Sequence, residues 1–419
     1  MFETASLLVV ASALFAWLNY HSIRLPTTIG IMVIALIFSL GMVLIGHFGP
    51  LDPAAIGAHW LQEIDFNTTL MEGMLSFLLF AGALHVNLQR LYKSRAIIAL
   101  LATAGVLLST AIIGFGSHYI LGAMGIELPL IYCLLFGSLI SPTDPVAVMS
   151  ILKSAGAPKD LEVKIAGESL FNDGIAVVVF LALLGIATGD ASADAASIGK
   201  LFALEAGGGI VLGLACGALV YWMLADVDNY QVEVLLTLAL VMGTYSLALT
   251  LHVSGVLAMV VAGLLIGNQG RAKAMSETTR EHLDTFWELV DEILNAVLFL
   301  LIGLEVMLVQ FTGTIIWAGL AMAVLTLGSR FLSVWLATTA LGVKTSIHPK
   351  LPTLLTWGGL RGGISVALAL GLPQGPMRET VLALTYVVVV SSILTQGLSI
   401  GRLIETVFGK DAATKSSAH

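Results

Sequence analysis

Long apolar stretches, separated by short polar loops, follow one another along the whole chain. Each stretch is long enough to cross a hydrocarbon core of roughly 30 Å as a helix. Thirteen such blocks can be distinguished, at about residues 5–22, 28–47, 69–86, 96–121, 128–152, 164–188, 200–224, 232–251, 253–268, 286–309, 313–341, 352–372 and 380–404. The pattern therefore predicts an all-α membrane protein with about 13 transmembrane helices.

The lysines and arginines of the loops predict which side of the membrane each terminus faces, because positive charge is retained on the cytoplasmic side. With the N-terminus outside, fifteen of the nineteen basic residues fall in inward-facing loops, and only Lys200 and Arg378 in outward-facing ones. This alternation needs an odd number of spans. The blocks 232–251 and 253–268 must therefore be two separate spans, divided at the short polar break near His252. We expect a plasma (inner) membrane protein with a cytoplasmic C-terminus.

Composition agrees with a membrane location. Of 419 residues, 58% are hydrophobic and 11% are charged, whereas charged residues make up about 25% of an ordinary soluble protein. The net charge of −8 argues against a nucleic-acid partner, because binding a phosphate backbone needs a concentrated basic surface.

Two of the apolar blocks are interrupted near their middle. Ser141-Pro142-Thr143-Asp144-Pro145 has two prolines, which remove amide donors and clash with preceding carbonyls. Four glycines surround Arg361 in the stretch 358–363 and weaken the helix there. We expect broken helices near 141–145 and 358–363. Each is the central member of a three-span unit, and the two units have opposite topology, as in the inverted repeats of secondary transporters.

Ionisable residues inside a span are functional candidates, because each costs at least about 2.5–3.5 kcal/mol on insertion scales. Four stand out: Asp144, Glu168, Asp173 and Arg361. Asp173 lies roughly 13 Å from the cytoplasmic end of its span at helical rise, and Asp144 reaches nearly the same depth. The two carboxylates can therefore meet near the midplane.

Neighbouring faces of the sixth block have different expected roles. Glu168 shares one helical face with Asn172, and Ser169 shares the adjacent face with Asp173. Arg361 lies at the same depth in its own span and must be paired. We expect a structural ion pair between Glu168 and Arg361, which leaves Asp144 and Asp173 for ion binding.

A second structural pair is expected between Glu305 and Arg330, which lie on neighbouring spans.

Carboxylates, a hydroxyl, an amide and freed carbonyls are oxygen ligands that suit a hard cation. Two acids held close together in a low dielectric favour binding of either a proton or a cation. If the protein rearranges only when this site is occupied, the competition produces cation/proton exchange. A channel or uniporter, the alternative class, would bind without that requirement. The chain has no HExxH motif and no P-loop, so an enzyme, ATP-driven pumping and a resident cofactor are not indicated.

Several stretches resemble the monovalent cation:proton antiporter-1 family, the NhaP/NHE type. Its fifth and sixth helices are similar to Leu139-Ile140-Ser141-Pro142-Thr143-Asp144-Pro145-Val146-Ala147-Val148 and Gly167-Glu168-Ser169-Leu170-Phe171-Asn172-Asp173-Gly174. Further matches, in family order, are Ser254-Gly255-Val256-Leu257-Ala258 with Ala262-Gly263, residues 295–304, and Arg361-Gly362-Gly363-Ile364-Ser365. The matches cover nearly the whole chain.

The resemblance implies an NhaA/NhaP-like antiporter fold that exchanges Na+ or Li+, and sometimes K+, for H+ by alternating access. It implies a homodimer of thirteen-helix protomers with an elevator-like motion of a six-helix core. In one domain over residues 1–409, the core would span about 96–188 and 313–404, the dimerisation or scaffold helices about 5–86 and 200–309, and a short cytoplasmic tail would follow at 410–419.

The resemblance also implies which residues serve the ion. The ion-binding set is Asp173, Asp144, Ser169, Asn172 and Thr143, the last through its main chain, and the structural pair is Glu168 with Arg361. We expect a Na+/H+ antiporter, with K+/H+ exchange as the alternative.

Two positions bear on how closely the site follows the family. Asn172 before Asp173 resembles the version associated with electroneutral exchange. Many relatives have an acid where this chain has Ala81, which leaves open whether the third block contributes a carboxylate. Glu72, nine residues earlier, is the alternative.

Overall fold

The computed structural model describes residues 2–48, 69–154, 157–189, 195–309, 311–341 and 350–408. Over these residues the chain is almost entirely helical, and the only β-type pairing is one isolated bridge. The predicted all-α fold is therefore confirmed. The expected tail, 410–419, lies outside the described residues.

Helices follow one another in the order that the apolar blocks predict. The elements are α1 (Phe2–Leu18) with η1 (Asn19–Ile23), α2 (Thr27–Phe48), η2 (Thr69–Met74) with α5 (Leu75–Leu84), α6 (Leu88–Lys93), α7 (Arg95–Leu100) with η3 (Leu101–Gly105) and α8 (Val106–Ala123), α9 (Leu130–Ile140), α10 (Val146–Ser154), α11 (Lys159–Thr188), α12 (Ala195–Phe202) with η4 (Ala203–Gly207) and α13 (Gly208–Ala225), α14 (Tyr230–Leu251), α15 (Gly255–Leu265) with η5 (Ile266–Gly270) and α16 (Arg271–Lys273), α17 (Glu277–Glu305) with η6 (Val306–Leu308), α18 (Gly313–Ala340), α19 (Leu351–Trp357), α20 (Gly363–Leu370), and α21 (Pro376–Ser392) with η7 (Ile393–Gly397) and α22 (Leu398–Phe408).

Within the described residues, nine helical segments are long and apolar enough to cross a membrane. The remaining blocks correspond to the shorter α5, the two broken helices and α17, whose first half is charged. The multi-pass architecture is confirmed, and the total of thirteen spans stays a prediction.

The chain separates into two helices at His252, as the loop pattern requires. Helix α14 ends at Leu251, and His252 takes a left-handed conformation with φ of 53°. Helix α15 then begins at Gly255, capped by Ser254, whose Oγ accepts a hydrogen bond from the Leu257 N–H at 3.2 Å. A side-chain cap at a new helix start supports two separate helices.

Two broken helices cross at the centre of the molecule. The first break separates α9 from α10, and the second separates α19 from α20. The Asp144 N–H donates to the Leu360 carbonyl at 2.8 Å, so the two broken segments run antiparallel where they meet. Helix α8 packs against α9 and α18, and α18 packs against α21. The two units therefore form one body around the crossing, as the predicted inverted repeat requires.

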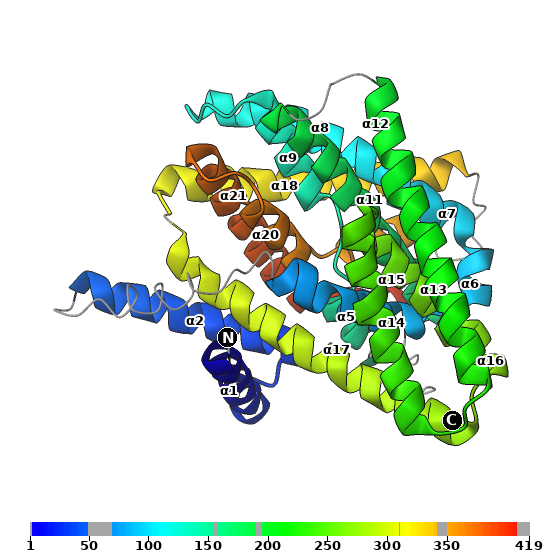
Figure 1. Cartoon of the computed structure of the whole chain (residues 1–419). Coiled ribbons are helices and arrows are strands. Elements are labelled where there is room, and N and C mark those ends of the chain that lie inside the picture. Colours follow the sequence, from blue (N-terminus) through cyan, green and yellow to red (C-terminus); the bar gives the residue numbers. More distant parts are fainter. Residues whose placement is uncertain are drawn as a thin grey trace.

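The long helix α17 passes diagonally across the molecule in Figure 1. It packs against α1 and α2 on one side and against α5 and α14 on the other. Its inner face reaches α20, next to the second break. This position brings residues of α17 to the same place as both broken helices.

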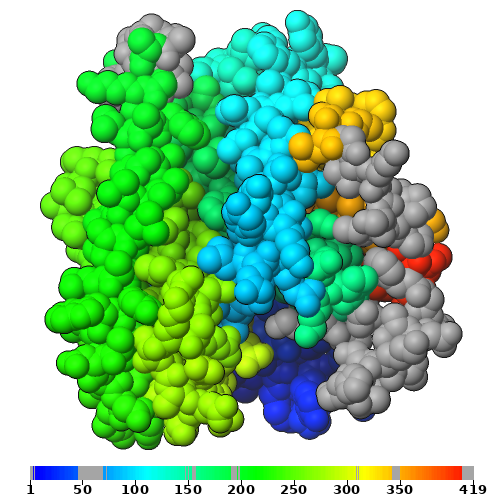
Figure 2. Space-filling view, turned by 90° about the vertical axis from the view of Figure 1, so that its right-hand side faces the viewer, coloured from blue at the N-terminus to red at the C-terminus, as the bar shows by residue number. Residues whose placement is uncertain are grey.

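The outer surface carries the apolar side chains expected of a lipid-facing protein. Figure 2 shows the green helices α12 and α13 at one edge, beside the cyan segment that holds α6 and α7. On α13, Val211 is 66% exposed and Trp222 is 71% exposed. Such a surface is stable in hydrocarbon rather than in water.

Candidate ion-binding site

The guanidinium of Arg361 binds the backbone that the first broken helix leaves unpaired. Its Nη1 donates to the carbonyls of Ser141 and Pro142, the latter at 2.8 Å. Its own backbone N–H donates to Ser392 Oγ at 3.2 Å. Free carbonyls at this depth need a partner from the protein. Arg361 therefore joins the two broken segments, and it is 3% exposed.

Glu168 pairs with Arg330, which corrects two predictions. Nη1 and Nη2 of Arg330 contact the two carboxylate oxygens of Glu168, the second contact at 2.8 Å. Both side chains are almost fully buried, at 2% exposed for Glu168 and 7% for Arg330. The predicted direct pair of Glu168 with Arg361 is therefore wrong, and so is the predicted pair of Arg330 with Glu305. Both predicted pairs were chosen from depth along the spans, and depth does not show which face of α18 packs against α11.

Three polar side chains expected at the site bind one another. The hydroxyls of Thr143 and Ser169 lie 2.9 Å apart. Asn172 Nδ2 donates to Thr143 Oγ1 at 2.9 Å, and the Thr143 N–H donates back to Asn172 Oδ1 at 3.4 Å. This network fixes the extended segment between α9 and α10 against α11. It holds Asp144, the next residue, in place.

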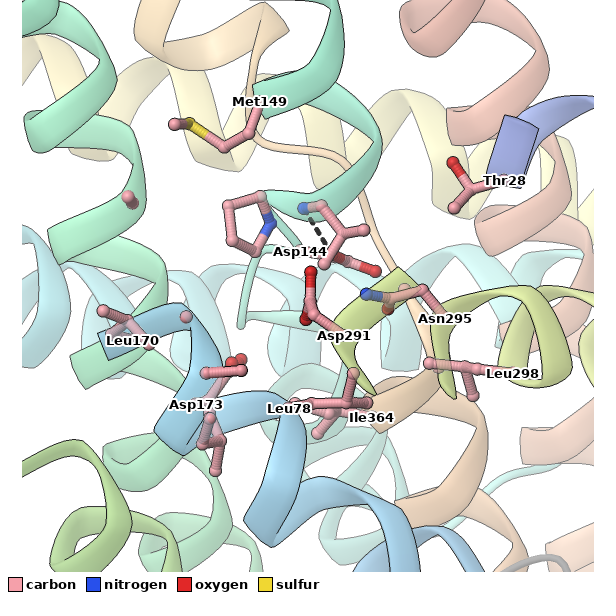
Figure 3. A pocket seen from close by; sticks show the side chains of 18 of the residues that line it. Thr28, Leu78, Asp144, Met149, Leu170, Asp173, Asp291, Asn295, Leu298 and Ile364 are labelled. Carbon is pink, nitrogen blue, oxygen red and sulfur yellow. Dashed lines mark hydrogen bonds between the residues drawn. The ribbon is translucent and has the colours of Figure 1, made fainter. Parts of the chain in front are cut away.

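A cavity of about 850 Å³ lies beside the crossing. Thr143, Asp144 and Asp173 line it, whereas Ser169 and Asn172 are not among its lining residues. Asp144 Oδ1 accepts the Val146 N–H at 2.9 Å, which caps α10. Figure 3 shows the carboxylates of Asp144 and Asp173 on the walls of the same cavity. The structure thus brings together the two acids that the sequence placed at one depth.

The cavity is strongly acidic. Seven carboxylates are among its lining residues, and no lysine or arginine lines it within the described part of the chain: the acids are Asp144, Glu162, Asp173, Asp284, Glu288, Asp291 and Glu292. Four of them lie on α17. Ala81 also lines the cavity, so the third block presents a methyl group there. The Glu72 side chain lies outside the described residues.

Gly362 leaves the space that the Asp144 carboxylate occupies. A Cβ atom at position 362 would lie 2.0 Å from Asp144 Oδ2, so one of the two groups would have to move. We expect Gly362→Ala to destabilise the fold by ~1–3 kcal/mol, the usual cost of overpacking. Thermal unfolding in detergent would measure this.

Gly82→Ala is the matched control, because Gly82 lines the same cavity but its added Cβ would make only an ordinary contact, 3.5 Å from Leu170. Equal melting temperatures for the two variants would contradict the tight fit of Asp144 against Gly362.

Two broken helices that cross in a helical membrane protein, with carboxylates facing a cavity beside the crossing, define the class of secondary transporters. Comparison with known proteins gives the family. The family model described as "Sodium/hydrogen exchanger, transmembrane" matches residues 9–406. The chain belongs to this family, which confirms the resemblance found in its motifs.

Individual relatives are similar along most of their length. The Na(+)/H(+) antiporter NhaP of Pseudomonas aeruginosa is 49% identical over 420 residues, which cover 99% of this chain and 99% of the relative. The Na(+)/H(+) antiporter NhaH of Halobacillus dabanensis is 37% identical, over 82% of this chain and 84% of its own. The solved sodium proton antiporter MjNhaP1 of Methanocaldococcus jannaschii superposes with a TM-score of 0.73 at 21% identity, covering 96% of this chain and 97% of that one. This last similarity shows a common fold.

Proposed function

We propose that this protein is a secondary active antiporter that exchanges Na+, or Li+, for H+ across the plasma membrane. The observation that carries the proposal is the pair Asp144 and Asp173, which face one acidic cavity beside the crossed helix breaks. The relatives named above as Na(+)/H(+) antiporters support it. The K+/H+ alternative receives no support from them. The family is one of transporters, and neither enzymatic activity nor a resident cofactor is part of the proposal.

Competition at the carboxylates provides the exchange. In this proposal Asp173 binds the ion and Asp144 lies beside the same cavity. Either a proton or a metal ion compensates the negative charge of these carboxylates. Once either is bound, the protein can change between its inward-open and outward-open states. Thr143, Ser169 and Asn172 hold the first break in position through their mutual hydrogen bonds. A channel has no such requirement for an occupied site.

The cavity reaches helix ends that the loop charges place in the cytoplasm. Its lining includes His85 just after α5, Glu162 in the first turn of α11, and Asp284 in the first half of α17. We therefore assign this structure to the inward-facing state. The homodimer, the elevator-like core and the scaffold helices remain part of the proposal.

The charges of the buried set favour electroneutral exchange. Asp144, Glu168 and Asp173 supply three carboxylates, and Arg330 and Arg361 supply two guanidinium groups. With all five ionised, the set carries one negative charge, which either one Na+ or one H+ cancels. The moving site would then carry the same charge in both directions.

Proteoliposomes test the proposed function. We expect external Na+ or Li+ to dissipate a preformed acid-inside pH gradient, with a much smaller effect of K+. A membrane potential of either sign, imposed while the pH gradient is clamped, should change the Na+ flux less than about twofold, since a site that is neutral in both loaded forms moves no net charge through the field. A strong dependence on voltage would exclude electroneutral exchange. Equal responses to Na+ and K+ would exclude the selectivity.

A further inference from the structure

Asn295 is a buried amide without a partner in the wall of the acidic cavity. It lies on α17, one helical turn after Asp291, and is 1% exposed. Neither its Oδ1 nor its Nδ2 makes a hydrogen bond. Figure 3 shows Asn295 and Asp291 beside each other, on the side of the cavity where Asp144 lies.

Packing alone does not explain a buried asparagine whose amide makes no hydrogen bond. Burial of a polar group without hydrogen bonds costs free energy, and an apolar side chain of the same shape removes that cost. Leu298, on the same face of α17, is an apolar residue at the cavity wall. The position therefore tolerates the apolar side chain that stability alone would favour, and the amide indicates a ligand.

The surroundings of the amide define the chemistry of that ligand. An amide oxygen and carboxylates are hard oxygen donors, which suit a cation such as Na+. Asp291 and Asp144 supply the carboxylates, and Asp144 comes from the broken helix, on a different element from Asn295. The cavity of about 850 Å³ leaves room for water around the ion.

The positive groups placed near the acidic row on α17 bind Asp284. Arg271 pairs with Asp284, near the other end of the acidic row on α17. His85 is the one histidine among the described lining residues, and its Nε2 lies 4.0 Å from Asp284 Oδ1.

We propose that Asn295 and Asp291 of α17, together with Asp144, form a second position for a partly hydrated monovalent cation, on the path to Asp173. This inference rests on the proposed function, because Na+ is the transported ion there. The position joins α17 to the first break. A cation held in it is already partly stripped of water and lies next to Asp144, so the position sets the affinity for Na+ rather than the rate of the exchange step.

Transport kinetics with Asn295→Leu provide the first test. In proteoliposomes we expect the KM for Na+ to rise about tenfold, the effect of losing one favourable ligand, with Vmax changed less than about twofold. In Na+-free detergent the variant should unfold at the same temperature as the unchanged protein or a higher one, because an unpaired buried amide has been removed. A merely structural asparagine predicts the opposite, a lower melting temperature with an unchanged KM, and that result would overturn the proposal.

Asn295→Asp is the second variant, and it keeps the shape of the side chain. We expect it to lower the KM for Na+, because a carboxylate replaces a neutral ligand. Thr28→Val is the matched control, since Thr28 lines the same cavity but has no part in the proposed position; its KM should equal that of the unchanged protein. A KM in Asn295→Asp at or above the unchanged value would count against the cation position.

Binding without transport separates this inference from the proposed function. Na+ should still raise the melting temperature of purified Asp173→Asn, although that variant does not exchange ions, and the effect should vanish in Asp173→Asn with Asn295→Leu. If Asp173→Asn shows no Na+-dependent shift while the unchanged protein exchanges Na+ for H+, the antiporter assignment stands and the second position does not exist.

Discussion

Replacing Asp173 by asparagine is expected to abolish the exchange of Na+ for H+. The variant keeps the shape of the side chain but removes the negative charge on which both substrates depend. Asp173 is 5% exposed and faces the cavity, and loss of a charge partner in such a site costs about 2–5 kcal/mol. We expect the Na+-induced dissipation of a pH gradient in proteoliposomes to fall at least about thirtyfold, since about 1.4 kcal/mol corresponds to a factor of ten.

Asp160→Asn is the matched control for this experiment. Asp160 lies in the first turn of the same helix, α11, and pairs with Arg90 at 2.8 Å on the surface, where its side chain is 60% exposed. The same chemical change at this position should leave exchange nearly unaffected, because exposed ion pairs contribute little. Full exchange by Asp173→Asn would remove this residue from the mechanism.

Arg330→Ala is expected to give the largest loss of stability among single substitutions at the site. It removes both contacts to Glu168 and the hydrogen bond from Nη2 to the Leu355 carbonyl at 3.2 Å. The carboxylate of Glu168 then remains charged and buried, and breaking a buried pair in this way costs about 3–5 kcal/mol. Thermal unfolding and monodispersity in detergent measure the effect.

Two further variants test whether the stability lost in Arg330→Ala comes from the unpaired carboxylate of Glu168. Arg90→Ala removes a surface arginine from the pair with Asp160 and should change the melting temperature little. The double variant Glu168→Leu with Arg330→Leu removes both charges at once and should recover most of the stability lost in Arg330→Ala. If Arg330→Ala unfolds at the same temperature as the unchanged protein, the buried carboxylate of Glu168 does not depend on Arg330 and the pairing in this structure is not the important one.

The fold was predictable from the chain because lipid restricts the possible structures. Every long apolar block became helix, since the backbone has no other way to satisfy its polar groups in hydrocarbon. The breaks at Pro142 and near Arg361 were predictable for a related reason: proline and glycine disfavour helix at any depth. Asp144 and Asp173 line one cavity, in agreement with the similar depths that a residue count gives along two neighbouring spans.

Partners across helices were not predictable in the same way. Arg330 was recognised as lying inside a span, but its partner depends on how α18 rotates and packs, which a residue count does not give. Asn295 was visible only as part of a matching motif, and its unpaired amide is a property of the folded cavity. Both cases depend on side-chain orientation between elements that are far apart in sequence.

The bonds from Arg361 to the first broken helix also have a consequence for biosynthesis. Arg361 and Ser141 are 220 residues apart in the chain. During translation, the segment at Ser141 and Pro142 enters the bilayer long before the ribosome has made the guanidinium that its carbonyls bind. The N-terminal half therefore waits in the membrane with an incomplete centre, and the carboxylates of Asp144 and Asp173 acquire their final geometry only when the last quarter of the protein has been inserted.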